Sequence, residues 1–385
     1  MKLNELVERI GIDRSVLYEF TLRYVDVQKI QAKMNQSNLD GKPSIRLNYN
    51  EQSPIRLSDG SGLGKIVVSD KVVGRFAVAF EQNNLTKKNH VVSTLELMVS
   101  DGGNNLQNLN TAEYQARISD VFEYLAQEYG VKADYGSIRI KRLELNATFF
   151  LEETYEKYRL PILFIMRNMP TKKYGTYRNN DAVKYATWHE SNVAKNKDSL
   201  ETVAIQNSTR IFKIYNKKKH LLDIGEISEA EATAEPRDIM RVEYTIKDKR
   251  LLNSFFGDDL VSSLTDEKIK EFFQKNFNAD VVQPFAQWAA NNHKELIEMV
   301  QRHRENEQKW PGYFLRECRQ YNESHHLPIL FDIDDMRSVF KALEPKGSRN
   351  DGKKFKKFKQ KATYEADLTG NTRRIKEIMS KIMSL

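Results

Sequence analysis

Apolar and polar residues alternate along several stretches of the chain. This alternation predicts β-strands, because successive side chains of a strand point to opposite faces. The stretch 138–150 shows it most clearly: Leu143, Leu145, Ala147 and Phe149 are apolar, and the positions between them are polar. Further strands are predicted for 16–25, 72–81, 91–99, 201–205, 210–215 and 239–247. A polar connection joins the second and third of these, which indicates a hairpin.

Other stretches follow the helical period, in which apolar residues recur every three or four positions. Thr111 is the predicted N-cap of a helix that runs through Tyr129 and ends at Gly130. Further helices are predicted at 3–10, 228–234, 266–277 and 286–306. Residues 36–64 are rich in Ser, Asn, Asp and Gly, so we expect a long surface loop there.

Strands dominate as far as residue 260 and helices dominate after it, and this distribution predicts an α+β fold. We expect a central antiparallel sheet with helices packed on one face, followed by a helical C-terminal region. The predicted domains are 1–260, which contains the sheet, 261–345, which is helical, and 346–385, which is a basic tail.

Two predicted strands each place an arginine and a carboxylate on the face that points away from the core. Arg142 and Glu144 share that face in one strand, and Arg241 and Glu243 share it in another. Glu96 repeats the acidic pattern more weakly in a third strand. If these strands are neighbours, the carboxylates gather on one surface. Hard divalent cations take oxygen ligands, so Glu144, Glu243 and Glu96 are candidate ligands for Mg²⁺ or Mn²⁺.

The strand 210–215 adds a phenol and ammonium groups to the same kind of surface. Lys213, Tyr215 and Lys217 alternate with apolar residues and lie on one side. A tyrosine, with a pKa of about 10, needs a nearby cation to act as a nucleophile near neutral pH. We expect Lys213 and Lys217 to lower the pKa of Tyr215 and to offset charge on a phosphate. These groups are the parts needed to break a DNA phosphodiester bond.

Each of these residues also has a structural interpretation. Arginine and glutamate on one strand face more often form a cross-strand salt-bridge ladder than a metal site. A tyrosine in a strand usually packs half-buried. The run 217–219 is equally consistent with a solvated strand end or with a contact to DNA phosphate.

Composition narrows the class of protein. The 385 residues carry a formal net charge of +8 and the sequence pI is about 9.1, which suits a polyanionic partner without requiring one. Cys318 is the only cysteine, so an intramolecular disulfide and paired-cysteine zinc sites are excluded and a reducing, cytoplasmic location fits best. No signal peptide and no apolar run of membrane-spanning length is found, so no membrane partner is expected.

Other motifs add little to the argument. No histidine pair of the kind that many nicking enzymes use for metal is found, and no Gly-rich phosphate loop is present, which argues against an NTPase. Tyr174, Tyr177 and Tyr185 lie in a basic polar stretch and are rival nucleophiles, base-stacking residues or ordinary loop residues. The run 353–359 interleaves lysines with phenylalanines, as either a polyanion clamp or a flexible solubilising tail.

The ordered set of motifs resembles the gene II/gene X replication-initiation proteins of filamentous phages and related rolling-circle plasmids. The motifs are Arg142 to Phe149, Glu201 to Lys217 and Arg241 to Glu243, followed by Leu251 to Gly257. Similar residues lie upstream at 95–97 and 105–107, and the resemblance covers about 16–260.

This resemblance implies a Mg²⁺- or Mn²⁺-dependent nickase that opens one DNA strand at a replication origin and stays linked to the 5′ phosphate. It assigns Tyr215 as the nucleophile with Lys217 beside it, and Glu144 and Glu243 as metal ligands. The first acid of the family is more often aspartate, and 171–200 is extra length.

The predicted partners are origin DNA, single-stranded or melted, and the host helicase and polymerase. The basic residues expected to contact the DNA are Lys213, Arg142, Arg241, Lys218, Lys353 and Lys354. The alternative is a DNA-binding replication initiator that carries out no catalysis.

Overall fold

The computed structural model describes residues 3–39, 45–70, 73–82, 91–98, 106–134, 138–169, 202–206, 208–306 and 370–385, with the single positions 353, 356, 357 and 360. The chain forms two compact units. Unit 1 combines 1–150 with 206–273, and unit 2 combines 151–205 with 274–384. The predicted domain 1–260 differs from this division, because 151–205 groups with the C-terminal part of the chain rather than with the sheet.

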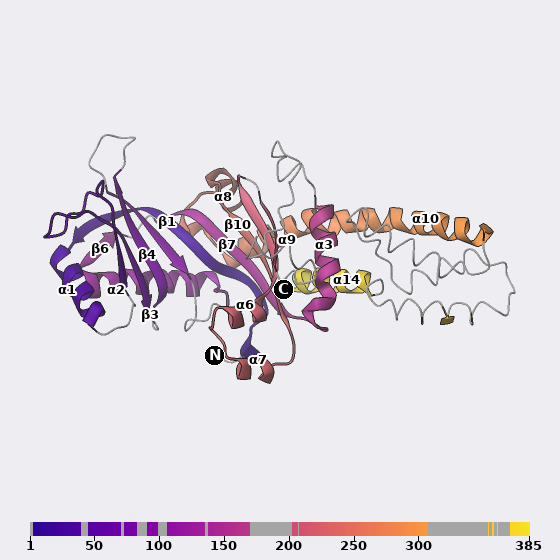
Figure 1. Ribbon diagram of the computed structural model, residues 1–385. Helices are drawn as coiled ribbons and strands as arrows, with labels where there is room; N and C mark the ends of the chain where they lie inside the picture. Colours follow the sequence, from indigo (N-terminus) through magenta and orange to yellow (C-terminus); the bar gives the residue numbers. More distant parts are fainter. Residues whose placement is uncertain are drawn as a thin grey trace. The chain divides into compact units, whose positions relative to one another are not determined.

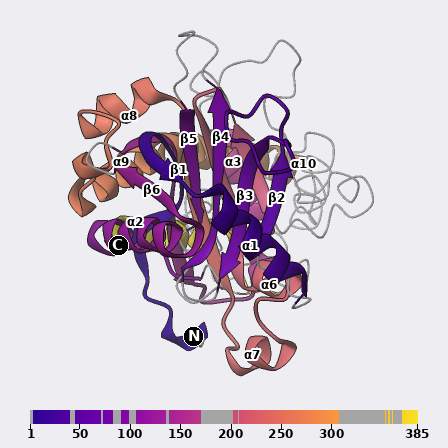
Figure 2. The same cartoon turned by 90° about the vertical axis from the view of Figure 1, so that its left-hand side faces the viewer.

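Unit 1 is built on an antiparallel sheet (Figure 1). Its strands lie in the order β2 (Ile45–Tyr49), β3 (Leu63–Asp70), β4 (Gly74–Gln82), β5 (Val91–Met98), β1 (Arg9–Val25), β7 (Arg139–Phe150), β10 (Ile239–Ile246) and β9 (Arg210–Asn216). β6 (Val131–Asp134) pairs with the C-terminal part of β1. Figure 2 shows β5, β4, β3 and β2 side by side.

One face of the sheet forms the core of unit 1, beneath α2 (Thr111–Tyr129). The Asn110 side chain, not that of the predicted Thr111, caps this helix at its N-terminus in a capping box with Glu113. Gly130 ends the helix in the left-handed conformation, as predicted. The ring of Phe122 packs edge-on against Phe20 of β1, with centroids 5.2 Å apart. The apolar stripe predicted for 111–129 therefore faces the apolar side of the alternating strands.

Two further helices pack on this core face beside β10. They are α8 (Lys249–Phe256) and α9 (Asp266–Phe277). The rings of Phe272 and Phe273 contact Tyr244 of β10, and Phe255 of α8 contacts Phe272. Thr265 accepts a hydrogen bond from the backbone N–H of Lys268 at the start of α9.

The opposite face of the sheet is covered at one end. Phe150 and Ile239 point to this face and pack with Leu221 of α6 (Lys217–Asp223) and Ala232 of α7 (Glu229–Ala234). The 3₁₀-helix η1 (Leu3–Glu5) supplies Leu3 to the same cluster. Figure 1 shows the N-terminus beside α6 and α7. The side chains that the alternation directs away from the core are thus buried at this end as well.

Unit 2 is helical over most of its described length. It contains η2 (Tyr155–Tyr158), α3 (Arg159–Asn168), the π-helical turn η4 (Asn278–Val282), α10 (Gln283–Asn306) and α14 (Asn371–Ser384). The Tyr158 hydroxyl bonds the Glu377 carboxylate, and the Arg374 guanidinium lies 2.7 Å from the Glu153 carboxylate. β8 (Thr202–Gln206) precedes β9 in the chain.

The predicted α+β class is confirmed, and most predicted strands and helices form within a few residues of their expected bounds. Two predictions are wrong. Helix 3–10 is reduced to η1, because β1 already begins at Arg9. The predicted loop 36–64 contains the end of α1 (Val27–Leu39) and the whole of β2. The predicted basic tail 346–385 contains the helix α14, whose buried Ile375, Ile378 and Ile382 recur at helical spacing.

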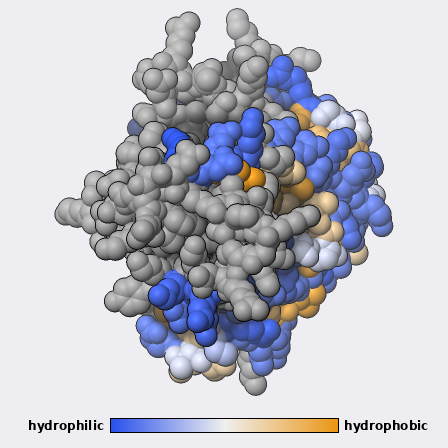
Figure 3. All heavy atoms as spheres, turned by 90° about the vertical axis from the view of Figure 1, so that its right-hand side faces the viewer, coloured by the Kyte–Doolittle hydropathy of each residue, from blue (hydrophilic) through white to orange (hydrophobic). Residues whose placement is uncertain are grey.

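Hydrophilic side chains make up most of the described surface in Figure 3, with smaller hydrophobic areas among them. Among the described side chains, the large apolar ones that are exposed are Val7, Tyr49, Ile224 and Met383, which lie far apart in the sequence. Within the described ranges, none of the helices combines the length and the apolarity needed to cross a bilayer.

Candidate metal centre and tyrosine site

Three carboxylates from three adjacent strands converge inside unit 1. Asp13 lies on β1, Glu144 on β7 and Glu243 on β10, and one oxygen of each lies within 4.8 Å of the others. All three side chains are buried, with 3–5% of each residue exposed. Buried carboxylates this close repel one another, so the cluster requires compensating positive charge or protonation.

The strand registers explain this convergence. Glu144 stands opposite Arg14 on one side and Thr245 on the other, so Glu144 and Glu243 are diagonal neighbours on one sheet face. The register between β1 and β7 shifts between Ile12 and Arg14, which makes Asp13 the extra residue of a β-bulge. A bulge re-aims a side chain. Here it turns Asp13 toward the carboxylates of β7 and β10.

Sequence reasoning missed Asp13. Asp13 precedes the predicted strand 16–25, and alternation gives no sign of the bulge between Ile12 and Arg14 that holds it. The available signal is an aspartate immediately after the buried Ile12, followed by a second charged residue.

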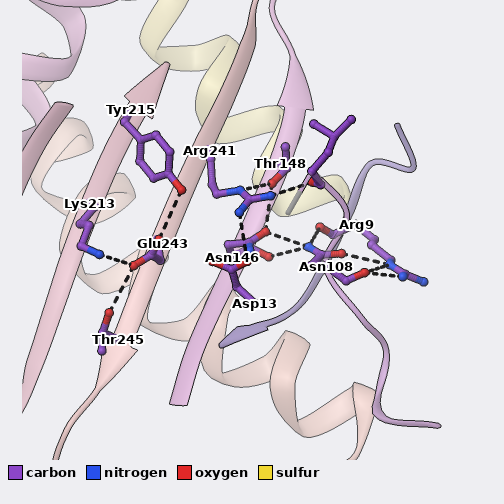
Figure 4. A network of polar contacts seen from close by, with 11 residues as sticks. Arg9, Asp13, Asn108, Asn146, Thr148, Lys213, Tyr215, Arg241, Glu243 and Thr245 are labelled. Atoms are coloured by element: carbon purple, nitrogen blue, oxygen red, sulfur yellow. Dashed lines mark hydrogen bonds and ion pairs between the residues drawn. The ribbon is translucent and has the colours of Figure 1, made fainter. Parts of the chain in front are cut away.

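Tyr215 and Lys213 of β9 point toward Glu243 from the other side (Figure 4). Lys213 stands opposite Glu243 and Tyr215 opposite Arg241 in the antiparallel register. The Lys213 ammonium lies 2.5 Å from Oε1 of Glu243, and the Tyr215 hydroxyl lies 3.5 Å from Oε2. The structure therefore brings Tyr215, Lys213, Glu144 and Glu243 together, as the shared strand face predicts.

Arg241 holds the side of the cluster next to Asp13. Its side chain is fully buried and donates from Nε to Thr148 Oγ1 at 2.8 Å, from Nη1 to Asp13 at 3.1 Å and from Nη2 to the Leu106 carbonyl at 2.7 Å. The prediction that Arg241 contacts DNA is wrong, because this guanidinium has no exposed surface. It is a buried partner of Asp13 instead.

A second set of hydrogen bonds extends this network toward the surface. The Thr148 hydroxyl donates to Asn146 Oδ1, which also accepts from the Asn108 side chain at 2.9 Å. Asn108 in turn accepts from Arg9, whose guanidinium also pairs with Glu113. Figure 4 shows Asn108 between Arg9 and Asn146. The segment before α2 is thereby fixed against β1 and β7.

The two glutamates of the cluster titrate differently. Burial, followed by the charge of Glu243, raises the pKa of Glu144 to about 7, although Lys213 and Arg142 oppose this shift. Burial also acts to raise the pKa of Glu243, but the Lys213 ammonium and the Arg241 guanidinium outweigh it and the pKa is lowered. Near neutral pH, Glu243 is therefore ionised and Glu144 is partly protonated.

Burial also has the largest effect on the pKa of the Tyr215 phenol. It raises the pKa of Tyr215 well above its usual value of 10.0, and the nearby Arg241 does not reverse this effect. The prediction that lysines lower this pKa is wrong, because desolvation of the phenolate exceeds the attraction of the cations. Tyr215 is therefore a neutral hydroxyl in the isolated protein.

Lys217 near Arg241 and His220 beside the Tyr215 phenol both have lowered pKa values. Lys217 is the first residue of α6 rather than part of the strand, and it is 1% exposed. Burial, then the charge of Arg241, lowers its pKa to about 7. The His220 ring lies edge-on to Tyr215, and burial with the charges of Lys217 and Arg241 lowers its pKa to about 4.

The other predicted site residues lie around the cluster or away from it. Glu96 pairs with Arg14 and Lys65, so it lies outside the group of three carboxylates. Arg142 pairs with Glu144 and keeps part of its side chain exposed. Lys218 donates to the Glu235 carbonyl.

Two of the predicted DNA contacts lie in the C-terminal run of lysines. Lys353 is exposed, and Lys354 lies outside the described residues. The rival nucleophiles Tyr174, Tyr177 and Tyr185 also lie outside them.

The donor set fits a hard divalent cation. Asp13, Glu144 and Glu243 present three carboxylates with oxygens at mutual distances that one ion spans, and Mg²⁺ and Mn²⁺ prefer oxygen ligands. Burial, followed by the charge of Glu243, raises the pKa of Glu144 to about 7, so its ionised form is disfavoured in the cluster without further positive charge beside it. A bound divalent cation would supply it.

A search of protein-family models finds no match to the chain, and neither curated proteins nor solved structures match it. The resemblance to replication-initiation proteins therefore remains a prediction that depends on its own motifs.

Proposed function

We propose that the protein is a metal-dependent DNA strand transferase that nicks one strand at a replication origin through a covalent phosphotyrosine at Tyr215. The observation that carries this proposal is the 3.5 Å approach of the Tyr215 hydroxyl to Glu243, a member of the three-carboxylate cluster. The contact places a candidate nucleophile next to a candidate metal site, and a metal ion there would orient a phosphodiester for attack by the phenol.

The residues have complementary parts in this reaction. The Tyr215 oxygen forms a bond to phosphorus while the bond from phosphorus to the 3′ oxygen breaks, and the leaving oxygen takes up a proton as the 3′ hydroxyl. Because burial keeps Tyr215 neutral, its proton must leave during the attack. The Glu243 oxygen that the hydroxyl already faces is the acceptor.

The cations around the cluster bind and neutralise phosphate. Lys213 and Arg142 are partly exposed and paired with Glu243 and Glu144, so they border the buried carboxylates on the accessible side. A divalent cation bound by Asp13, Glu144 and Glu243 would supply Lewis acidity at the phosphate. Arg241 keeps Asp13 aimed at that position.

One observation favours the alternative, a replication initiator that binds DNA without cleaving it. Arg241, Lys213 and Arg142 already pair with Asp13, Glu243 and Glu144 in turn. Three carboxylates and three cations make a balanced network, which can serve structure alone. Measurements of DNA cleavage and of metal binding distinguish the strand transferase from the non-catalytic initiator.

The test is a cleavage assay on labelled single-stranded DNA from a candidate origin, with Mn²⁺ or EDTA. We expect the wild-type protein to form a covalent adduct when the reaction contains Mn²⁺ and no adduct when it contains EDTA. The adduct should survive denaturation. Tyr215→Phe should bind the same DNA with unchanged affinity and form no adduct. Tyr18→Phe is a matched control, because Tyr18 lies on the same sheet face but bonds Asp259 instead of the cluster.

An adduct that forms equally in EDTA would exclude the metal. Tight binding with no adduct under any condition would leave the non-catalytic initiator as the function.

A further inference from the structure

The sheet face that carries the three carboxylates continues beyond them across β1, β5, β4, β3 and β2. Directly opposed residues of an antiparallel sheet point to the same side. One such row runs from Arg142 through Val16, Glu96, Ala77 and Val67 to Arg46. Helix α2 covers the other face of the sheet. In the row described here, Arg46 is exposed, and Arg142, Val16, Glu96 and Val67 are partly exposed. The row is a solvent-facing path that leads to the carboxylate cluster.

This open face is strongly cationic. Its basic side chains are Arg14, Arg46, Lys65, Arg75 and Arg142. Outside the carboxylate cluster, the described side chains on this face of β1 to β5 include one acidic residue, Glu96. Its carboxylate pairs with Arg14 and Lys65. Within the described part of the chain, Arg46 and Arg75 form no ion pair. Positive charge therefore remains available at the end of the face farthest from the cluster.

The residues between the cations are small. The short side chains on this face belong to Val16, Val67, Ala77 and Ala79, and the longer cationic side chains extend beyond them. Arg46 on β2 lies five strand spacings from Arg142 on β7, roughly 24 Å at the usual distance between strands. A surface of this length with cationic side chains along it matches an extended polyanion better than a single phosphate.

We propose that this face, from Arg46 and Arg75 to Arg142, binds single-stranded DNA and guides it to the three-carboxylate cluster. The proposal deepens the proposed function and depends on it for the destination of the strand. Single-stranded DNA is the occupant because the carboxylates are almost completely buried, so the phosphate must arrive on a flexible chain. The bases of a single strand also have apolar faces, which can pack on the valine and alanine side chains of this surface.

Binding of fluorescein-labelled oligo-dT of 20 nucleotides in EDTA tests the proposal without cleavage. The test variant is Arg46→Ala/Arg75→Ala, which removes two exposed cations far from the cluster. The control is Arg250→Ala/Lys270→Ala, which removes two exposed cations from α8 and α9, on the core side of the sheet. Anisotropy at several salt concentrations gives the affinity and its salt dependence.

We expect the test variant to bind oligo-dT on the order of tenfold more weakly. Its slope of log affinity against log salt should be smaller than that of the wild type by about 1.4, since each phosphate contact to a single strand contributes about 0.7. The control variant should keep the wild-type affinity and slope. A 20-base-pair duplex should show a smaller difference between wild type and test variant than oligo-dT shows.

An unchanged slope in Arg46→Ala/Arg75→Ala would overturn the proposal, as would equal losses in the test and control variants. A loss confined to the duplex would assign the face to double-stranded DNA and also overturn it. These outcomes are independent of the adduct assay. The face can therefore bind DNA even if Tyr215 is not a nucleophile, and the adduct can form even if the strand takes another path.

Discussion

At the scale of single residues, the candidate site is a small set of charges held at low exposure. Asp13, Glu144 and Glu243 are kept together by the cations Arg241 and Lys213, and by the protonation that the raised pKa of Glu144 favours. The position of each side chain follows from strand register, and its charge follows from burial. Two residue-scale predictions test these causes separately.

The first prediction concerns the metal. Asp13→Asn, Glu144→Gln and Glu243→Gln keep the size of each side chain but remove a negative oxygen ligand, so each should weaken Mn²⁺ binding by on the order of 100-fold. Calorimetric titration of Mn²⁺ into each variant measures this. Glu96→Gln is the control and should bind Mn²⁺ as the wild type does, since Glu96 pairs with Arg14 and Lys65 instead. Equal loss in Glu96→Gln would contradict the assignment of the ligands.

The second prediction concerns pH. The pKa of His220 is lowered from 6.5 to about 4, so between these values the unfolded state binds the proton that the folded state refuses. Stability should therefore fall as pH decreases from about 6.5 to about 4. Because His220 is partly exposed, solvent screening reduces the loss to ~1–2 kcal/mol.

Urea unfolding at pH 7.5 and pH 5 measures this change in the free energy of unfolding. His220→Gln should lose less stability than the wild type over the same interval. An identical pH dependence in the two proteins would show that His220 titrates normally in the folded state.

At the scale of elements, the site depends on two features of β1: the bulge at Asp13 and the close approach of the segment before α2. Ile12 and Leu109 exchange backbone hydrogen bonds of 2.8 and 2.9 Å. A Cβ at Gly11 would lie 2.6 Å from the Leu109 carbonyl oxygen, so glycine is needed where the two backbones meet.

Gly11→Ala should therefore destabilise the protein by ~1–3 kcal/mol and weaken Mn²⁺ binding, because it pushes the 106–109 segment away from β1 next to Asp13. The control is Gly225→Ala, where the new Cβ meets no atom within 4 Å although φ is +71°. That substitution should cost ~1–2 kcal/mol through backbone strain and leave Mn²⁺ affinity unchanged. Normal Mn²⁺ affinity in Gly11→Ala would show that the contact does not position Asp13.

The sequence predicts part of this site well. Period-two alternation places Glu144, Glu243 and Tyr215 on one sheet face, and the structure brings them together. Alternation says only that a side chain points away from the main core, and it cannot show that α6, α7 and η1 cover the other face at this end. The burial of Arg241 and the raised pKa of Tyr215 follow from that cover. Asp13 was missed because the strand was predicted to begin only at residue 16, whereas β1 begins at Arg9, and because a bulge interrupts the alternation at Asp13.

At the scale of the whole molecule, the chain builds unit 1 from two separate ranges and places most of its C-terminal helices in unit 2. Domain prediction from the sequence placed a boundary near 260, because local patterns change from strand to helix there. Spatial grouping depends on packing between distant segments, such as α14 against α3. A local pattern does not contain that information.

The division predicts that the two units lose structure separately. Ile378 of α14 is fully buried, and Ile378→Ala should cost ~2–5 kcal/mol through the cavity it leaves. Amide hydrogen exchange should then accelerate in α3 and α14 while β1, β7 and β10 keep their protection. Equal acceleration in both sets would show that the units unfold as one.

The central claim is that Tyr215 attacks a phosphodiester held at the carboxylate cluster. Its most direct test is mass spectrometry of the protein after reaction with single-stranded origin DNA and Mn²⁺, followed by nuclease and protease digestion. The account predicts a nucleotide attached to the peptide that contains Tyr215 and no modified peptide in Tyr215→Phe. A nucleotide attached to Tyr177 or Tyr185 instead, with Tyr215→Phe fully active, would contradict it.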